Sequence, residues 1–445
     1  MDDLEIKIAI TYKVPENSLT LNGLLRGLEH NRDEIMRTIL GRILEALEEK
    51  AKNDYPPGRY VLNGHQSTAR NLMTSFGRIR HRMAQVMDRT TGAVVFPLIE
   101  RLKIEPYRQY QRETLEAPVG LAIHLSYRWA MKETRRIRGH GPSTSTLWRR
   151  LQEVAESQGG WPPLKHRPFA FLMVDGTKVR LQDRGTSLES AEMRWAWASE
   201  GVGKPFELVG FWVGDNWETI RRDLSRRLNY GRLRMLFSDG GPGIEDNLRS
   251  ARMEIQRCLW HGHHDFRFLL YADEVKGPAQ REFLELLNRN PLFHLRQAGL
   301  ETLKPEDEPL VRKLARTIRS GFGELLAALP ESRYPKTRTY LLNFSRQALA
   351  FFDYWLDHQR WIPFTTNIAE SAFSRVVNRI KRVGRRWSEP GLLNGLTMAF
   401  HKIFHLALWT GLWRQYLRFH RSLHLASLIS EYRWINAITQ LWNKL

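Results

Sequence analysis

Three acidic residues stand in contexts that suit metal-assisted chemistry on phosphate esters. Asp175 and Asp239 each follow an apolar run and precede glycine, in the strings VDGT (174–177) and FSDGG (237–241). Glu370 ends the string TNIAE (366–370), near the start of an expected helix. Carboxylate oxygens are the ligands that hard Mg²⁺ prefers, and this ion keeps positions for phosphate and water. The three residues are therefore candidate metal ligands.

Each of these acids also has a plainer interpretation. An Asp-Gly pair after a strand is more often a simple turn, and Glu370 alone fits a solvated basic helix with one incidental acid. The metal interpretation is favoured because Glu370, Phe373 or Ser374, and Val377 share one helical face, while cations occupy much of the rest. The candidate DNA-binding residues after Glu370 are Arg375, Arg379, Lys381, Arg382, Arg385 and Arg386.

Four short motifs, taken in order, resemble the Asp-Asp-Glu (DDE) transposases of the Mutator-like class and their prokaryotic insertion-sequence relatives. They are DGT (175–177), SDG (238–240), CLWH (258–261) and TNIAE (366–370), the last containing Asn367. The resemblance spans roughly residues 165–405. It implies an α/β, ribonuclease-H-like catalytic domain with a mixed sheet and an all-helical insertion. It also implies Asp175, Asp239 and Glu370 as catalytic and metal-binding residues.

The Cys258/His261 pair has three interpretations. Followed by His263 and His264, it is similar to part of a zinc site, but structural zinc needs four ligands and a second cysteine is absent from the sequence. The resemblance places the pair close to the catalytic acids, where His261 would contact DNA phosphate or orient a carboxylate. A buried structural pair is the alternative. Asn367 belongs with these accessory motif residues.

The reaction that the resemblance implies is phosphodiester hydrolysis followed by transesterification, with two Mg²⁺ (or Mn²⁺) ions per site. The expected DNA partners are the terminal inverted repeats of a transposon and a target DNA, bound by a homodimer or a larger assembly. A nuclease or junction resolvase on the same fold would share the acids without joining strands. A domesticated, non-catalytic DNA-binding protein is the other alternative.

Composition agrees with a folded, DNA-binding protein. The 445 residues include 68 Lys and Arg against 48 Asp and Glu, a formal charge of +20, which favours a polyanionic partner. Anionic lipid or a basic protein without such a partner are the alternatives. The 42% hydrophobic content argues against extended disorder, and one cysteine excludes an intramolecular disulfide. Apolar stretches near 403–413 are too short to span a bilayer, so we expect a cytosolic or nucleoid-associated protein without a membrane partner.

Changes in periodicity predict the domain organisation. Strand-like alternation is expected at 4–14 and 59–87, around a helical segment at 18–50. Further strands are expected at 168–179, 194–198, 206–213 and 233–237, with a short one at 256–260. Helices are expected at 243–257, 279–356, 365–382 and 391–412. The domains are a small α+β region (1–115), a helix-turn-helix-like segment (116–160), a first catalytic part (165–262), the insertion (263–350), a second catalytic part (351–412) and a helical tail (413–445).

The segment 118–156 is a candidate DNA-binding element. It breaks at GHGP (139–142), and a second helix begins after Ser143 or Ser145. That helix carries Arg149 and Arg150, which would reach DNA in a helix-turn-helix. A plain helical hairpin packed on the core is the alternative. Among the tryptophans, Trp387 either stacks on an unpaired base or packs, whereas core packing is expected for Trp195, Trp197, Trp212 and Trp217.

Overall fold

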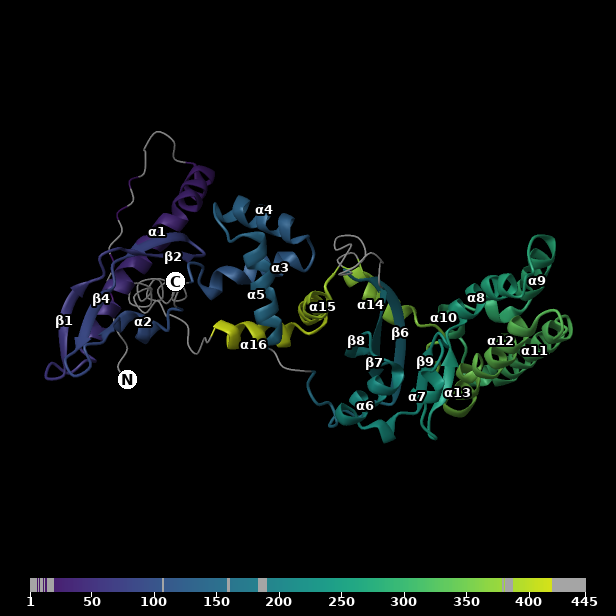
Figure 1. The fold of residues 1–445 in the computed structure, drawn as a ribbon. Coiled ribbons are helices and arrows are strands. Elements are labelled where there is room, and N and C mark those ends of the chain that lie inside the picture. Colours follow the sequence, from purple (N-terminus) through teal and green to yellow (C-terminus); the bar gives the residue numbers. More distant parts are fainter. Residues whose placement is uncertain are drawn as a thin grey trace, which may run out of the picture. The chain divides into compact units, whose positions relative to one another are not determined.

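The protein is described here by a computed structural model, and it is an α/β protein (Figure 1). The chain divides into two compact units. Unit 1 comprises Met1–Gln158 and His405–Leu445, and unit 2 comprises Gly159–Phe404. The first boundary lies in the Gly/Pro-rich segment that follows the predicted helix-turn-helix. The described residues are 20–105, 108–157, 161–182, 190–377 and 387–417, with 6, 8, 11, 13 and 380.

Unit 1 contains one long helix and five short antiparallel strands. Helix α1 (Leu21–Lys52) begins after Thr20, whose hydroxyl accepts a hydrogen bond from the Gly23 amide at 3.0 Å. The strands form two sheets, β1-β4-β5 and β2-β3. Their bounds are β1 (Tyr60–His65), β2 (Arg70–Thr74), β3 (Gly77–His81), β4 (Ala84–Asp88) and β5 (Val94–Val95). A cluster including Leu44, Ile79 and Leu98 joins α1, β3 and α2 (Pro97–Leu102) in one core. The described residues up to Leu102 thus combine helices with antiparallel sheets.

The other described elements of unit 1 are helical. It comprises η2 (Arg112–Leu115), α3 (Glu116–Ala122), α4 (Tyr127–Arg138), α5 (Thr144–Glu156) and α16 (Leu406–Leu417). Helix α4 ends at Gly139, whose φ of 71° is the left-handed conformation that glycine adopts without strain. Helix α5 begins after Ser143, whose hydroxyl accepts a hydrogen bond from the Thr146 amide at 3.1 Å. The prediction of two helices about this turn is confirmed.

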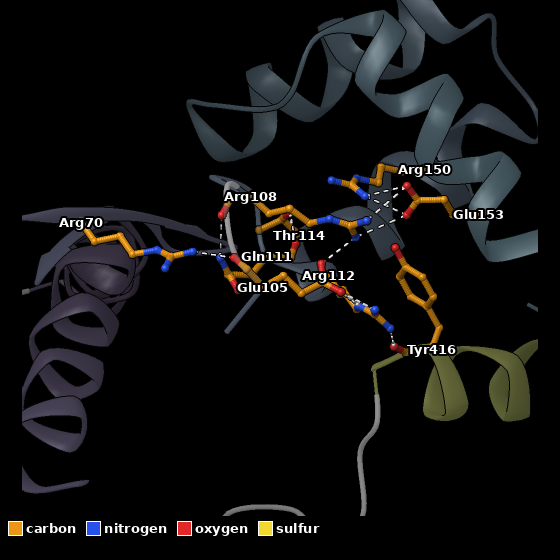
Figure 2. Close-up of polar contacts among 9 residues, drawn as sticks. All are labelled: Arg70, Glu105, Arg108, Gln111, Arg112, Thr114, Arg150, Glu153 and Tyr416. Atoms are coloured by element: carbon orange, nitrogen blue, oxygen red, sulfur yellow. Dashed lines mark hydrogen bonds and ion pairs between the residues drawn. The ribbon is translucent and has the colours of Figure 1, made fainter. Parts of the chain in front are cut away.

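An arginine network holds α16 within unit 1 (Figure 2). Arg112 donates to the Tyr416 carbonyl oxygen at 2.7 Å and is also paired with Glu105. Its guanidinium carbon lies 4.7 Å from the centroid of the Tyr416 ring. The sequence prediction placed 406–412 in the second catalytic part, whereas these residues lie in unit 1. The expected helix at 391–412 is wrong as one element, since α15 (Glu389–Phe404) and α16 are separate helices.

Unit 2 is built on a five-stranded mixed sheet of order β10-β9-β6-β7-β8. Strands β6, β7 and β8 pair antiparallel, while β6, β9 and β10 pair parallel. The bounds are β6 (Phe171–Arg180), β7 (Ser190–Ser199), β8 (Glu207–Val213), β9 (Met235–Ser238) and β10 (Glu254–Arg257). The predicted strands at 168–179, 194–198, 206–213 and 233–237 are confirmed with shifted ends.

Helices cover both faces of this sheet. Helices α6 (Trp217–Arg227) and α7 (Ile244–Leu248) share one core with Leu172 and Val174 of β6. On the other face, ring contacts join the strands to α13 (Ala350–His358), α14 (Asn367–Val377) and α15. Phe171 meets Tyr354 at 6.0 Å, Trp195 meets Phe373 at 4.2 Å, and Phe211 meets Phe400 at 4.7 Å between ring centroids. Successive residues of β6 therefore point into different helical layers.

Between β10 and α14 the described chain is helical, as predicted for 279–356. The elements are α8 (Leu259–Ala272), α9 (Pro278–Asn288), η4 (Pro291–His294), α10 (Gln297–Leu300), η5 (Pro305–Asp307), α11 (Glu308–Ala327), α12 (Pro335–Gln347) and α13. Buried phenylalanines pack them together, with Phe344 of α12 lying 6.2 Å from Phe266 and 6.0 Å from Phe322 between ring centroids. None of the described helices combines the length and apolar character that crossing a bilayer requires.

Several local predictions need correction. Asp175 lies within β6 and not at its end, because pairing with β7 continues to Arg180. The expected helix at 243–257 is restricted to α7, and β10 begins at Glu254. Trp217 opens helix α6 instead of lying in a strand, but all four tryptophans expected in the core are buried. Trp387 is also buried, and its indole donates to the Ile380 carbonyl oxygen at 3.2 Å, so packing is its role. The predicted strand at 4–14 falls largely outside the described residues, as do 378–379 and 381–382 of the helix expected at 365–382 and 418–445 of the tail.

Candidate active site

The central parallel strand pair brings Asp175 and Asp239 to one edge of the sheet. The last paired residues are Met173 of β6 and Phe237 of β9, and each aspartate follows its paired residue by two positions. Neighbouring strands lie about 4.8 Å apart, so the two acids emerge side by side where the parallel pairing ends. Phe171, Met173 and Asp175 are spaced two residues apart and so point to the same face of the sheet, the one covered by α14. Asp175 therefore lies where β6 stops pairing with β9, although β6 itself continues beside β7.

Asp175 is a buried acid in an electronegative environment. It is 5% exposed, and burial raises its pKa to about 7, with further contributions from the charges of Asp239 and Glu370. The Gly176 amide, which donates to Asp175 Oδ1 at 2.7 Å, and the charge of His261 only partly oppose this rise. A carboxyl group with such a pKa is about half protonated at neutral pH. A pKa raised in this way is typical of a buried carboxylate with acidic neighbours.

The Asp239 loop depends on a glycine. Gly240 has a φ of 80°, and a Cβ atom on it would lie 1.5 Å from the guanidinium carbon of Arg257. The Asp239 carboxylate accepts a hydrogen bond from the Gly241 amide at 2.8 Å. The space beside Gly240 is thus filled by Arg257. This side chain is 7% exposed and lies against the Tyr340 ring, 5.3 Å from its centroid.

Glu370 lies in the first turn of α14. Its Oε1 accepts a hydrogen bond from the Thr366 hydroxyl at 3.1 Å, and its side chain is 35% exposed. One turn further on, Phe373 stacks on Trp195 with an interplanar angle of 15°. Trp195 is the cross-strand partner of Asp175. The stack therefore fixes the helix that carries Glu370 directly over the strand pair that carries Asp175.

The Cys258/His261 motif connects the surroundings of the second and third acids. The Cys258 amide donates to the Ser238 carbonyl oxygen at 2.8 Å, next to Asp239. Its Sγ accepts a hydrogen bond from the Thr366 amide at 3.3 Å, four residues before Glu370. In the first turn of α8, His261 Nδ1 lies 3.7 Å from Glu370 Oε1. The motif thus lies beside the acids, as the resemblance implied.

The pKa of His261 is raised, which favours its protonated form at neutral pH. Burial lowers its pKa, but a hydrogen bond with Cys258 and the charges of Cys258, Asp175 and Asp239 outweigh burial and raise it to about 9. For the Cys258 thiol, burial raises the pKa, and hydrogen bonds from His261 and Thr366 outweigh it and lower the pKa. A partly buried imidazolium therefore stands among the carboxylates and offsets part of their charge.

The donor set fits a hard divalent cation better than zinc. Ligand atoms of Cys258, His261 and Glu370 lie within 4.8 Å of one another, which is the arrangement that suggests zinc. However, among the described residues these are only three of the four ligands that structural zinc uses. Asp175, Asp239 and Glu370 instead offer oxygen atoms whose mutual repulsion a cation would relieve.

The candidate DNA-binding residues lie in three settings. Arg375 of α14 is exposed, whereas Arg379, Lys381, Arg382, Arg385 and Arg386 lie outside the described residues. Asn367 is the exposed first residue of α14. In unit 1, Arg149 is exposed on α5, but Arg150 is only 15% exposed and pairs with Glu153 at 2.7 Å (Figure 2). The charge of Arg150 is therefore already matched within its own unit.

Sequence reasoning missed Arg257 and Thr366. Arg257 ends β10 and precedes the Cys-x-x-His motif by one residue, so its position beside a candidate motif was the available signal. Thr366 is fully buried and donates to both Cys258 and Glu370, through its amide and its hydroxyl. Its place at the start of the TNIAE string was visible in the sequence, but its two contacts depend on the fold.

The comparisons with known proteins concern unit 1. A family model described as "Uncharacterised protein family (UPF0236)" matches residues 14–157. This match covers the α+β region and helices α3 to α5, and it ends before the linker to unit 2. None of the curated proteins matches the chain. The interpretation of the acids in unit 2 therefore rests on their own geometry and on the motifs of the sequence.

Proposed function

We propose that this chain is a DNA transposase of the Asp-Asp-Glu type, whose unit 2 is a ribonuclease-H-like catalytic domain carrying a helical insertion. The proposed reactions are cleavage at transposon ends and transfer of the freed strand into target DNA. The mixed sheet, with its acids on the two adjacent central strands, is consistent with that domain. The helical segment α8 to α13 lies between the second and third acids, where the motif resemblance requires an insertion.

One observation carries the proposal, which is the convergence of three acids from distant parts of the sequence. Asp175 and Asp239 flank the end of one parallel strand pair, and the charges of Asp239 and Glu370 both act on Asp175. A structural role for these three acids is unfavourable, because like charges repel and the burial of Asp175 costs free energy. Their shared position is instead what a site for divalent cations needs.

The residues of the chain would act as follows. Asp175, Asp239 and Glu370 would hold two Mg²⁺ ions, which supply activation of water and stabilisation of the entering and leaving oxygens. His261, protonated at neutral pH, is suited to contact a phosphate oxygen and not to accept a proton. Arg257, packed against Gly240, holds the loop that carries Asp239. Exposed Arg375 adds positive charge on the helix of Glu370.

The test uses the full-length protein and duplexes made from the DNA that borders its reading frame. DNA binding is measured in chelator, and cleavage and strand joining are measured with Mg²⁺ and with Mn²⁺. We expect Glu370→Gln to abolish both reactions and to leave DNA binding unchanged. Glu389→Gln is the matched control, because Glu389 also lies in the first turn of a helix and is exposed but belongs to none of the four motifs.

Three results would contradict the proposal or narrow it. Cleavage by Glu370→Gln at the wild-type rate would remove that residue from the active site. Absence of metal-dependent cleavage in the wild type on every such duplex would favour a non-catalytic DNA-binding protein. Cleavage without any joining would favour a nuclease or resolvase, since strand transfer is what separates these enzymes from a transposase.

A further inference from the structure

Helix α8 carries a row of exposed aromatic side chains. Trp260 is 50% exposed, Phe268 57% and Tyr271 61%, and the partly exposed His264 lies between the first two. Their spacing of four, four and three residues places all of them on one side of the helix. Eleven residues of helix extend over about 16 Å. We call these four residues the α8 aromatic row.

Three rings of the row, those of Trp260, His264 and Phe268, are in contact, and cations flank the row. The His264 ring stacks on Trp260, with centroids 5.0 Å apart and an interplanar angle of 12°, and lies 5.2 Å from Phe268. The guanidinium carbon of Arg267 lies 5.0 Å from the centroid of Phe268, and Lys276 Nζ lies 4.3 Å from that of Tyr271. Exposed rings combined with cations suit flat, polyanionic ligands.

The row begins at the candidate active site. Trp260 is the neighbour of His261, and their rings meet edge to face at 4.8 Å. His261 in turn lies 3.7 Å from Glu370. From there α8 runs into the helical segment, where it packs against α9 and α12 (Figure 1). A strand of DNA that leaves the three acids along α8 would pass over the row.

We propose that the α8 aromatic row binds unpaired bases of a DNA strand next to the site of cleavage. Each base offers a flat face to a ring, while Arg267 and Lys276 are placed to meet the phosphates between bases. The formal charge of +20 favours this polyanionic occupant over a second copy of the same basic chain. The proposal rests on the proposed function, because it needs DNA at the three acids.

The experiment compares three DNAs of identical duplex sequence with the full-length protein in chelator. The first is blunt, the second has a single-stranded 3′ extension, and the third has an extension of equal length made of abasic sugars. Base stacking contributes roughly a fivefold to 150-fold gain in affinity per base. We expect the wild type to bind the base-containing extension at least about tenfold more tightly than the abasic one.

Variants then assign that preference to the row. Trp260→Ala and Phe268→Ala should each remove most of it and leave binding to the blunt duplex unchanged. Phe268→Tyr, which keeps a ring, should retain it. Leu310→Ala is the matched control, because Leu310 is 54% exposed in the same helical segment but has no ring. Circular dichroism and sedimentation of each variant report its folding and its oligomeric state.

The outcomes separate this inference from the proposed function. Equal binding of base-containing and abasic extensions, with blunt duplex still bound and cleaved, would overturn the row alone. A change of oligomeric state in Trp260→Ala or Phe268→Ala, with the base preference intact, would assign the row to contacts between copies and overturn the inference. Failure to bind any of the three DNAs would overturn both proposals together.

Discussion

Replacing Asp175 by asparagine tests the electrostatics of the site most directly. Asparagine has the same shape and keeps an oxygen that can accept the hydrogen bond from the Gly176 amide, now 2.7 Å long. It removes the ionisable proton and the negative charge, and it replaces the other carboxylate oxygen by an NH2 group that donates hydrogen bonds. The pKa of Asp175 is raised from 3.8 to about 7, mainly by burial and then by the charge of Asp239. At pH 8 the native protein therefore bears the cost of an ionised, buried carboxylate.

The size and sign of the effect follow from this shift. One pKa unit corresponds to 1.36 kcal/mol, so a shift of about three units sets an upper bound of about 4 kcal/mol. Because the folded pKa is raised, this cost is absent below about pH 4, grows as the pH rises towards 7, and is fully present above it. Relaxation of the structure around Asp175 makes the actual cost smaller than this upper bound. For a unit of roughly 250 residues, each kcal/mol moves Tm by about 2–4 °C.

Thermal melting in chelator between pH 4 and pH 8 measures the effect. We expect Asp175→Asn to melt about 5 °C above the wild type at pH 8 and at the same temperature near pH 4. Asp357→Asn is the control, because Asp357 is exposed on α13 and its replacement should leave Tm unchanged. Added Mg²⁺ should stabilise the wild type, since it binds only the folded state, and should have less effect on Asp175→Asn.

Two results would refute this reasoning. A lower Tm for Asp175→Asn at every pH would mean that the carboxylate has a structural role as a hydrogen-bond acceptor, and that the substitution leaves its donors unsatisfied. A gain in Tm that does not vary with pH would mean that protonation of Asp175 is not its cause. Retained cleavage by the stabilised variant would remove Asp175 from the catalytic residues while leaving the electrostatic argument intact.

Three further predictions concern the neighbours of this acid. His261→Gln should lower Tm below pH 6.5, because the surroundings that raise the pKa of His261 stabilise its protonated form in the folded protein. The difference in Tm from the wild type should shrink as the pH rises through about 9. A difference that does not depend on pH would mean that His261 stabilises the protein by packing. Phe373→Ala should lower the free energy of unfolding in urea by about 3–5 kcal/mol and should slow cleavage, because it removes the stack on Trp195. Phe373→Leu should recover most of the stability and most of the cleavage rate. Unchanged cleavage by Phe373→Ala would mean that the stack does not determine the position of Glu370. Replacing Arg379, Arg382 and Arg386 together by alanine should reduce the salt dependence of DNA binding by roughly three units of slope, and an unchanged slope would show that these residues do not touch the DNA backbone.

The strands of unit 2 could be predicted because their side chains alternate between two buried faces. The positions of Asp175 and Asp239 next to glycine also showed where carboxylates would leave the core. The sequence did not show that β6 continues past Asp175, because an Asp-Gly pair usually ends a strand. Here the antiparallel partner β7 pairs with β6 as far as Arg180, and this pairing overrides the local preference. Strand ends depend on partners that are distant in the sequence.

The place of Glu370 relative to the aspartates depends on contacts that have no local pattern. It follows from the stack of Phe373 on Trp195, two residues that lie far apart in the sequence and that each looked like ordinary core residues. Arg257 is a similar case, because the missing side chain of Gly240 provides the space that its guanidinium fills. The motif order predicts that the three acids act together, whereas the side chains that hold the segments around them emerged only from packing.

The cysteine of the Cys-x-x-His motif illustrates how a residue suited to a metal can have another role. Cys258 is 1% exposed, its amide is bonded to Ser238 beside the second acid, and its sulfur accepts from Thr366 beside the third. Thr366 donates in turn to Glu370. The His261 imidazole lies next to the same carboxylate, and its interaction with Cys258 raises its pKa. Any displacement of Cys258 would therefore move the two segments that carry Asp239 and Glu370 and would weaken the local positive charge. We infer that this pair positions the segments of Asp239 and Glu370 and offsets part of the charge of the proposed cation site.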